Sequence, residues 1–206
     1  HNVCRHRAMQ LLTDQDGTCS RLVCPYHGWA YANDGALIRA PRFEGGDDFD
    51  PADYGLFPVR LVTWQGLVFI CLDENTPEFD SWFGPLKSSI DDYLTTSRVY
   101  HGDIGEDVEC NWKNYVDHYQ EGYHIPLVHP RLARDTEWPD YRVVNLSGGS
   151  VHQVAARGGS GQPGLFGWRF PNLMFNTYGE GVSFMRIDPL GPGRCHVHYS
   201  HFRPAD

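Results

Sequence analysis

Two short segments near the start of the chain each carry one cysteine and one histidine. Cys4 and His6 form a C-x-H pair, and Cys24 and His27 form a C-x-x-H pair. Thiolate sulfur and imidazole nitrogen are ligands of zinc and of iron–sulfur clusters. Structural zinc sites usually keep two cysteines together, whereas here each pair mixes the two residue types. The pattern therefore favours an iron–sulfur centre, with zinc as the alternative.

A second group of metal-binding residue types lies near the middle of the chain. These residues are Glu121, His124 and His129, and the apolar spacing before them predicts a helix over residues 111–123. On a helix, Asp117, Glu121 and His124 would lie on one face. A proline then ends the helix, so His129 can turn back toward His124. Two imidazoles beside a carboxylate, with open positions, indicate an oxygen-activating iron. Histidines near a helix end also often face solvent or cap carbonyl groups, which is the structural alternative.

The letters CRHR and CPYHGW, which contain the four front residues, resemble the cluster loops of Rieske-type non-haem iron oxygenases. The resemblance implies a Rieske [2Fe–2S] cluster in which Cys4 and Cys24 bind one iron and His6 and His27 bind the other. Respiratory-chain Rieske proteins carry an extra cysteine in each loop, which this sequence lacks. An oxygenase-type or ferredoxin-type cluster is therefore expected.

The letters NWK, followed by E-x-x-H-x4-H, resemble the start of the catalytic domain in the α subunits of these oxygenases. Carried over, the resemblance implies that His124 and His129 bind mononuclear Fe(II). Glu121 would connect the Rieske cluster of a neighbouring subunit to that iron, and Asp117 would lie behind the ligands as a hydrogen-bonding residue. The third iron ligand of the family is a carboxylate beyond the end of this chain; Asp188 is a weak substitute because it reads first as a turn residue.

The acidic residue before the first iron histidine points to one branch of the family. Many ring-hydroxylating members have Asp at this position, whereas members that act on quaternary ammonium compounds often have Glu, as at Glu121. The segments 170–173 and 189–192 also look like that branch. A trimethylammonium group would need an aromatic cage. The candidate cage residues, which could instead be ordinary core residues, are Tyr141, Phe166, Trp168, Phe175, Tyr178 and Phe184.

The first hundred residues carry the turn signals and short apolar runs of β structure. Asn33-Asp34-Gly35 predicts a tight turn, residues 61–73 predict one long buried strand with an internal glycine, and residues 81–95 have helical spacing. The resemblance implies an all-β Rieske domain over residues 1–100. We expect its N-terminal strands to be missing, because the first residue, His1, stands three positions before a cluster ligand.

The remaining residues, 101–206, change in character. A short strand at 107–110 precedes the predicted helix, and a glycine-rich stretch over 148–164 looks mobile. Three alternating segments then predict an antiparallel meander: 173–178, 182–188 and 195–202. The resulting fold class is α+β, with the Rieske domain followed by the N-terminal part of a helix-grip (START-like) catalytic domain built on an antiparallel sheet. The resemblance implies that both ends of the intact subunit are absent.

The composition restricts the partners. The chain has 206 residues and a formal net charge of −9, so nucleic-acid binding, which needs clustered cations, is disfavoured. No run of 18 apolar residues is present, so we expect no membrane span. Six cysteines, at least two of them assigned to a metal, suit the cytoplasm better than a disulfide framework.

The resemblance implies a terminal oxygenase component. Electrons from NAD(P)H would arrive through a separate reductase or ferredoxin, and the iron would use O₂ to hydroxylate a small organic substrate, here a quaternary ammonium compound that loses an aldehyde. Electron transfer between neighbouring subunits implies a homotrimer. Three alternatives stay open: an aromatic-ring hydroxylating dioxygenase, a Rieske electron carrier without catalytic iron, and a zinc-binding interaction module.

Overall fold

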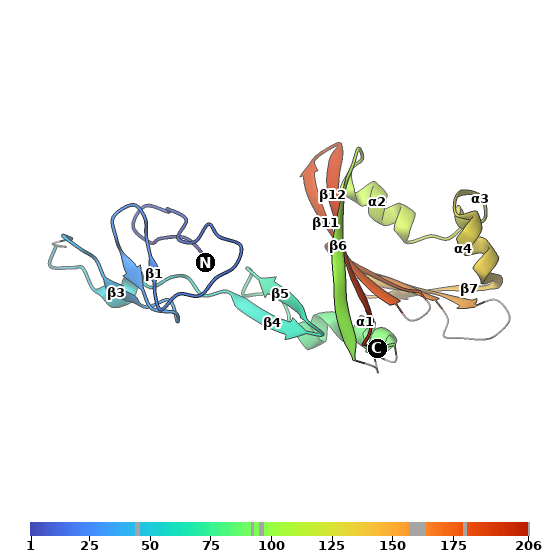
Figure 1. Cartoon of the computed structure of the whole chain (residues 1–206), viewed down its shortest axis with the longest axis horizontal. Helices are drawn as coiled ribbons and strands as arrows, with labels where there is room; N and C mark the ends of the chain where they lie inside the picture. Colours follow the sequence, from blue (N-terminus) through green and yellow to red (C-terminus); the bar gives the residue numbers. More distant parts are fainter. Residues whose placement is uncertain (44–45, 92, 95–96, 157–163, 179–180, 206) are drawn as a thin grey trace. The chain divides into compact units, whose positions relative to one another are not determined.

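The structure is a computed structural model that describes residues 1–43, 46–91, 93–94, 97–156, 164–178 and 181–205. It divides into two units, His1–Thr76 and Pro77–Asp206 (Figure 1). This division lies before the boundary at residue 100 that the sequence suggested. The segment concerned is helix α1 (Phe79–Asp91), whose contacts are with strands β8 (Gly149–Ala156) and β9 (Gly164–Arg169) of the second unit.

The first unit contains a small antiparallel sheet in the order β1-β2-β3. Its strands are β1 (Leu22–Val23), β2 (Ala30–Tyr31) and β3 (Leu37–Arg39), followed by a 3-10 helix at Pro51–Tyr54. The turn predicted at Asn33-Asp34-Gly35 joins β2 to β3, and Gly35 adopts a φ of 91°, which is why a glycine is needed there. Six buried residues form the core: Cys4, Leu11, Cys24, Trp29, Tyr31 and Leu37.

The segment predicted as one buried strand is a two-stranded hairpin. Strand β4 (Arg60–Trp64) pairs with β5 (Leu67–Cys71), and the two residues between them both have positive φ, 49° at Gln65 and 80° at Gly66. Such a turn matches the twist of paired strands, so the glycine marks a reversal and not a strand interior. The prediction of burial was also wrong, because Ile70 is 64% exposed.

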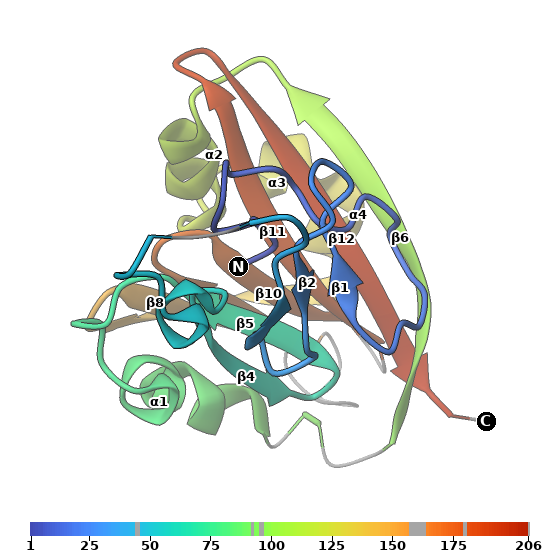
Figure 2. The ribbon, with the colours of Figure 1, turned by 90° about the vertical axis from the view of Figure 1, so that its left-hand side faces the viewer.

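The second unit is built on a seven-stranded antiparallel sheet in the order β6-β12-β11-β10-β9-β8-β7. The strands not yet defined are β6 (Arg98–Val108), β7 (Thr136–Leu146), β10 (Leu173–Tyr178), β11 (Gly181–Gly191) and β12 (Arg194–Pro204). Figure 2 shows β6, β12 and β11 as long strands side by side. The antiparallel meander predicted over the last three strands is confirmed, with the turn after Gly191, and the strand predicted at 107–110 is the end of the much longer β6.

Helices cover both faces of this sheet. Helix α1 lies below the curved sheet in Figure 1, and α2 (Trp112–Tyr119), α3 (Ile125–Val128) and α4 (Pro130–Asp135) lie above it. Alternate residues of a strand point to opposite faces, so neighbours such as Met174 and Phe175 are both fully buried. The face under α2 carries a core of Val116, Met174, Met185, Ile187, Cys195 and Val197. We call it the α2 face.

The glycine-rich stretch is largely strand where the structure describes it. Gly149 begins β8 and Gly164 begins β9, so both ends of the stretch that was expected to be mobile lie in strands. Gly158, Gly159 and Gly161 lie outside the described residues. Gly167 is needed for packing, because a Cβ there would lie 2.2 Å from the ring of Phe175. Among the described residues, no helix is both long and apolar enough to cross a bilayer.

Candidate metal sites

The two loops of the first unit that carry cysteine and histidine have the same backbone geometry. The amide of Ala8 donates to the carbonyl of Cys4, and the amide of Gly28 donates to the carbonyl of Cys24, both at 3.0 Å. The donor residue has a left-handed backbone in each loop, with φ of 55° at Ala8 and 73° at Gly28. Each loop is therefore a tight knuckle that holds its cysteine at a fixed position.

The four donors of these knuckles converge. Cys4 and Cys24 are each 2% exposed, and the ring centroids of His6 and His27 are 4.6 Å apart. The His6 ring stacks on Trp29 with 5.0 Å between centroids, and its Nδ1 atom is buried without a hydrogen-bond partner. An unsatisfied buried imidazole nitrogen is costly unless it binds a metal. Two buried thiols and two adjacent imidazoles fit the donor set of a Rieske cluster.

Tyr31 supports the sulfur side of this site. Its hydroxyl lies 3.3 Å from Cys4 Sγ and accepts a hydrogen bond of 3.0 Å from the amide of Arg5. Burial opposes ionisation of Cys4, yet hydrogen bonds from Tyr31 and from the His6 amide lower its pKa below the usual value. Burial and the neighbouring His27 lower the pKa of His6. Thiolate and neutral imidazole are the forms that bind metal. Sequence reasoning did not identify Tyr31, although its place two residues after a loop tryptophan in a short buried strand was visible.

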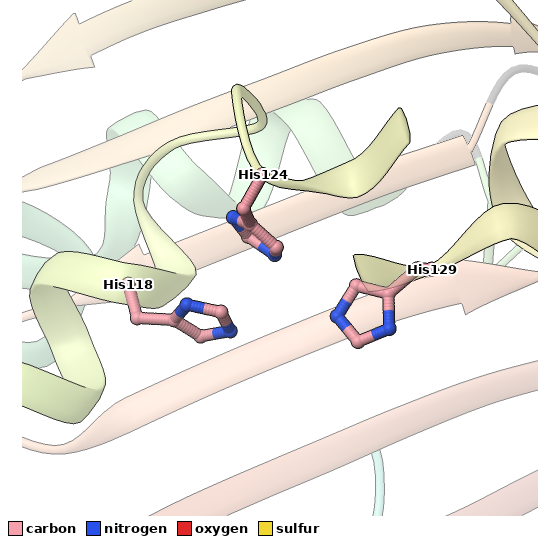
Figure 3. A group of neighbouring side chains, drawn as sticks. All are labelled: His118, His124 and His129. Atoms are coloured by element: carbon pink, nitrogen blue, oxygen red, sulfur yellow. The ribbon is translucent and has the colours of Figure 1, made fainter. Parts of the chain in front are cut away.

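Three histidines converge in the second unit, each at a helix boundary (Figure 3). His118 lies in the last turn of α2, His124 precedes α3, and His129 stands between α3 and α4. One ligand nitrogen from each ring lies within 4.8 Å of the others. The ring centroids of His118 and His124 are 4.0 Å apart, and those of His124 and His129 are 5.2 Å apart. Burial and then His124 lower the pKa of His118, which favours neutral imidazole.

Helix α2 ends four residues earlier than the sequence predicted. It stops at Tyr119, where the amide of Gln120 closes the last turn on the carbonyl of Val116 at 3.0 Å. Gly122 follows in a buried position where a Cβ would lie 2.5 Å from the ring of Tyr141. Glycine is a poor helix former, and here its small size admits the tyrosine. The predicted single helical face is therefore wrong, and a turn brings Glu121 to His124 instead.

Glu121 holds the His124 ring. Its carboxylate contacts His124 Nδ1, accepts from the amide of Tyr123, and accepts from the amide of His124 at 3.3 Å. Burial opposes ionisation of Glu121, but the hydrogen bond with His124 and those with the two amides lower its pKa below the usual range. The carboxylate therefore accepts from Nδ1–H, and the Nε2 atom of His124 is left to bind a metal.

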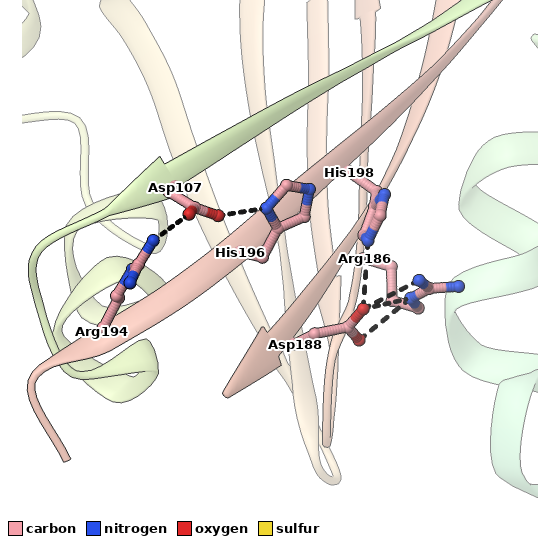
Figure 4. A network of polar contacts seen from close by, with 6 residues as sticks. All are labelled: Asp107, Arg186, Asp188, Arg194, His196 and His198. Atoms are coloured by element: carbon pink, nitrogen blue, oxygen red, sulfur yellow. Dashed lines mark hydrogen bonds and ion pairs between the residues drawn. The ribbon is translucent and has the colours of Figure 1, made fainter. Parts of the chain in front are cut away.

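The other two acidic residues considered from the sequence lie elsewhere. Asp117 is exposed on α2 and does not belong to the cluster of three imidazoles, so the role given to it stays a prediction. Asp188 forms an ion pair of 2.8 Å with Arg186 and lies 3.2 Å from His198 Nε2 (Figure 4). It sits inside β11, one residue after Ile187 of the α2 core, and so points to the opposite face.

The strand register separates the aromatic cage candidates. Phe166 and Trp168 pair with His152 and Ser150 on the α2 face, and the Tyr141 hydroxyl lies 2.5 Å from Nδ1 of buried His152. Two candidates are instead core residues of the opposite face, Phe175 and Phe184. The side chain of Tyr178 lies outside the described residues. Burial alone could not have separated them, since both faces of the sheet are covered.

Comparison with known families gives the wider context of these two sites. Residues 1–54 match the Rieske [2Fe-2S] domain, and residues 90–162 match the ring hydroxylating alpha subunit (catalytic domain). The chain belongs to the Rieske non-haem iron oxygenases. The two matched domains imply a Rieske cluster and a mononuclear iron, which confirms the predicted cofactors and the predicted fold class. The donor residue types of the two sites, two thiols with two imidazoles and a cluster of imidazoles, fit these two groups.

Similar proteins include enzymes that act on quaternary ammonium compounds. The chain is 37% identical over 157 residues to the glycine betaine monooxygenase oxygenase subunit of Pseudomonas aeruginosa, covering 76% of the chain and 36% of that protein. It is 30% identical over 210 residues to the chloroplastic choline monooxygenase of Spinacia oleracea, covering 95% and 47%. The chain thus spans about half the length, or less, of these relatives.

Solved structures show the same fold. The quaternary ammonium Rieske monooxygenase CntA in complex with an inhibitor superposes with a TM-score of 0.86 at 23% identity, covering the whole chain and 58% of that protein. The naphthalene 1,2-dioxygenase of a Rhodococcus species superposes with a TM-score of 0.82 at 23% identity, covering the whole chain and 59% of that protein. Monooxygenases and dioxygenases therefore share this architecture.

Proposed function

We propose that the protein containing this chain is the terminal oxygenase component of a Rieske system that oxidises a quaternary ammonium compound. The observation that carries the proposal is the presence, in one chain, of two buried cysteines beside two adjacent histidines and a separate cluster of imidazoles beside a carboxylate. Cys4, His6, Cys24 and His27 would hold the [2Fe–2S] cluster. His124 and His129 would hold Fe(II).

When bound, the cluster would supply single electrons and the iron would supply oxygen activation. The residues of the chain prepare these sites. Glu121 fixes the tautomer of His124 by accepting from Nδ1–H, so that Nε2 is presented to the metal. Trp29 covers His6 with its ring plane, and Tyr31 orients the Cys4 sulfur. Both supports restrict the motion of the donors and exclude water from the sulfur side.

Glu121 is also our candidate for the electron connection between subunits. One half of such a bridge is its contact with His124, and the second half would be a hydrogen bond to a cluster histidine of a neighbouring subunit. Inter-subunit electron transfer is ascribed to the structurally similar monooxygenase that oxidises carnitine. This supports a ring-shaped homotrimer that is reduced by a separate NAD(P)H-dependent reductase or ferredoxin. The cytoplasm, predicted from cysteine usage, is the proposed compartment.

The substrate class is supported by sequence relatives more than by a cage. The similar monooxygenases act, by their names, on choline and glycine betaine, and Glu121 stands where that branch often has Glu. On the α2 face, Trp168 packs against the core below α2, whereas Tyr141 and Phe166 are half-buried on strands β7 and β9. Aromatic faces such as these attract a trimethylammonium group. Oxidation of one N-methyl group would release an aldehyde and leave a tertiary amine.

Oxygen uptake tests this proposal. The full-length protein with its reductase and NADH or NADPH should consume O₂ with methylammonium compounds and release one formaldehyde per O₂. Aromatic acids serve as the comparison substrates. A cis-diol product from an aromatic substrate, without formaldehyde from any ammonium compound, would favour the ring-hydroxylating alternative that the dioxygenase structure represents.

Iron analysis separates the oxygenase from an electron carrier. A carrier needs only the two-cysteine, two-histidine site and would contain two irons per subunit. An oxygenase needs three irons per full-length subunit. The imidazole cluster of the second unit favours three. A zinc-binding module would contain no iron and would lack the visible absorption of a Rieske cluster.

A further inference from the structure

We infer that His118 is a third imidazole ligand of the metal held by His124 and His129. The inference rests on the proposed metal site and adds to it a residue outside the E-x-x-H-x4-H pattern. A metal about 2.1 Å from each nitrogen requires ligand atoms no more than about 4.2 Å apart. The three nitrogens already lie within 4.8 Å of one another, so a shift of roughly half an ångström closes the set.

The backbone brings His118 into this position. The end of α2 at Tyr119 leaves His118 in its last turn, and the reversal through Gly122 returns the chain so that His124 faces it. In Figure 3 the three rings come from three different helix boundaries and surround one space. The two rings nearest each other are tilted by 32°, and those of His118 and His129 by 65°, so the three rings approach from different directions.

Two arrangements without coordination would also place His118 beside His124, and each has its own consequence. His118 could simply stack on His124, in which case its removal would leave the number of coordinated nitrogens unchanged. It could also interact with the carbonyl end of α2, in which case its removal would affect folding and not metal binding. Neither arrangement requires one ligand nitrogen from each of the three rings to lie within 4.8 Å of the others, as they do here. Coordination of one metal ion does require the three nitrogens to lie this close together.

The test uses the full-length protein with its Rieske cluster intact and oxidised. Pulsed EPR of the nitric oxide adduct of the ferrous site should count three imidazole nitrogens in the wild type and two in His118→Asn. Equilibrium dialysis with Co(II) should show metal binding at least about tenfold weaker in His118→Asn. His101→Asn, an exposed histidine on β6, is the matched control and should retain three nitrogens.

Cluster absorbance and thermal unfolding verify that His118→Asn is folded. Two nitrogens in the wild type, or three retained in a folded His118→Asn, would overturn the assignment of His118. Unchanged metal binding in His124→Asn and His129→Asn would instead overturn the proposed iron site itself. The two failures are therefore distinguishable, and neither depends on turnover.

Discussion

The function of Glu121 depends on its charge and on its position beside one imidazole. The carboxylate is held below its ordinary pKa, so it remains ionised throughout the neutral range. An amide of the same shape would still offer an oxygen to Nδ1–H but would carry no charge. This substitution therefore separates the two roles proposed for Glu121, which are orienting His124 and connecting it electronically to a partner subunit.

Glu121→Gln should slow electron transfer more than it weakens metal binding. We expect reoxidation of the reduced cluster, in the presence of substrate and O₂, to slow at least about tenfold, because a neutral amide is a weaker acceptor than a carboxylate. The iron content of the mononuclear site should fall by less than half. Stopped-flow absorbance of the cluster gives the rate, and metal analysis gives the occupancy.

Glu109→Gln is the control and should behave as the wild type, because Glu109 is exposed between β6 and α2. An unchanged reoxidation rate in Glu121→Gln would contradict the electron-transfer role. Reoxidation in the wild type should also be insensitive to titration of Glu121 between about pH 5 and 8, since its folded pKa lies below that window.

At the level of secondary structure, the sheet of the second unit depends on one close contact between neighbouring strands. The Phe175 ring of β10 lies against Gly167 of β9, where a side chain of any size would overlap it. Gly167→Ala should therefore lower the free energy of unfolding by about 1–3 kcal/mol through overpacking. Chemical denaturation followed by circular dichroism gives the difference.

The exposed turn glycine Gly193 is the matched control, because a Cβ there meets nothing within 4 Å. Gly193→Ala should be close to neutral. Equal unfolding free energies for Gly167→Ala and the wild type would mean that the strand contact can relax, and the packing argument would then fail.

Strands β6 and β12 are joined by a charged network on the face opposite the α2 face. Asp107 contacts His196 and Arg194 (Figure 4), and these hydrogen bonds lower its pKa. A depressed carboxyl pKa stabilises the fold above the unfolded value, near 3.8, and the contribution is lost as the pH falls through the folded value. Asp107→Asn should therefore lower Tm at pH 7, and the difference should shrink as the pH falls below 3.8 and through the lowered pKa of Asp107.

Thermal scans of Asp107→Asn, the exposed-site control Asp140→Asn and the wild type across pH 2–8 measure this effect. The control should track the wild type at every pH. A Tm difference for Asp107→Asn that persists unchanged at pH 2 would show that the substitution acts through packing and not through charge.

The sequence predicted elements best where local pattern and tertiary burial agree. The meander of β10, β11 and β12 follows alternating residues, and its turn carries glycine and proline, so its prediction was correct. The hairpin of β4 and β5 was missed because continuous apolar letters look like one buried strand, although Gly66 marks the turn. Strands β8 and β9 were hidden by glycines whose reason is packing against Phe175 and Arg169, which no local pattern reveals.

In the candidate sites, too, local sequence pattern predicted some residues, and the path of the backbone in space determined others. Residue types and spacing were enough to select the four residues that converge in the first unit and the pair His124 and His129 of the second. They were not enough to find His118 or Tyr31, because both enter through the path of the backbone in space. Helical spacing also assigned Asp117, Glu121 and His124 to one face, and the early end of α2 removed that geometry.

For the whole molecule, the two donor sets belong to separate compact units. Loss of one metal should therefore leave the other in place. In the full-length protein, Cys4→Ser should abolish the visible absorption of the cluster and remove two irons while the third remains. His124→Asn should remove the third iron and keep the absorption.

The iron content and the visible absorption of the cluster are measured in each of the two variants. The wild type, with three irons, is the reference, and the double variant should contain none. Loss of all iron from either single variant would indicate that the two units fold or load their metals together.

The imidazole donors and the aromatic residues of the α2 face come from different parts of the second unit. A twelve-residue span around two short helices supplies every nitrogen, whereas strands β7, β8 and β9 supply Tyr141, His152 and Phe166. Substitution at Phe166 can therefore change the aromatic residues without altering the segment that carries the donors, whereas Tyr141 packs against Gly122 of that segment. We therefore expect proteins with this fold to diverge in substrate preference through single substitutions on these strands while the histidine segment stays unchanged.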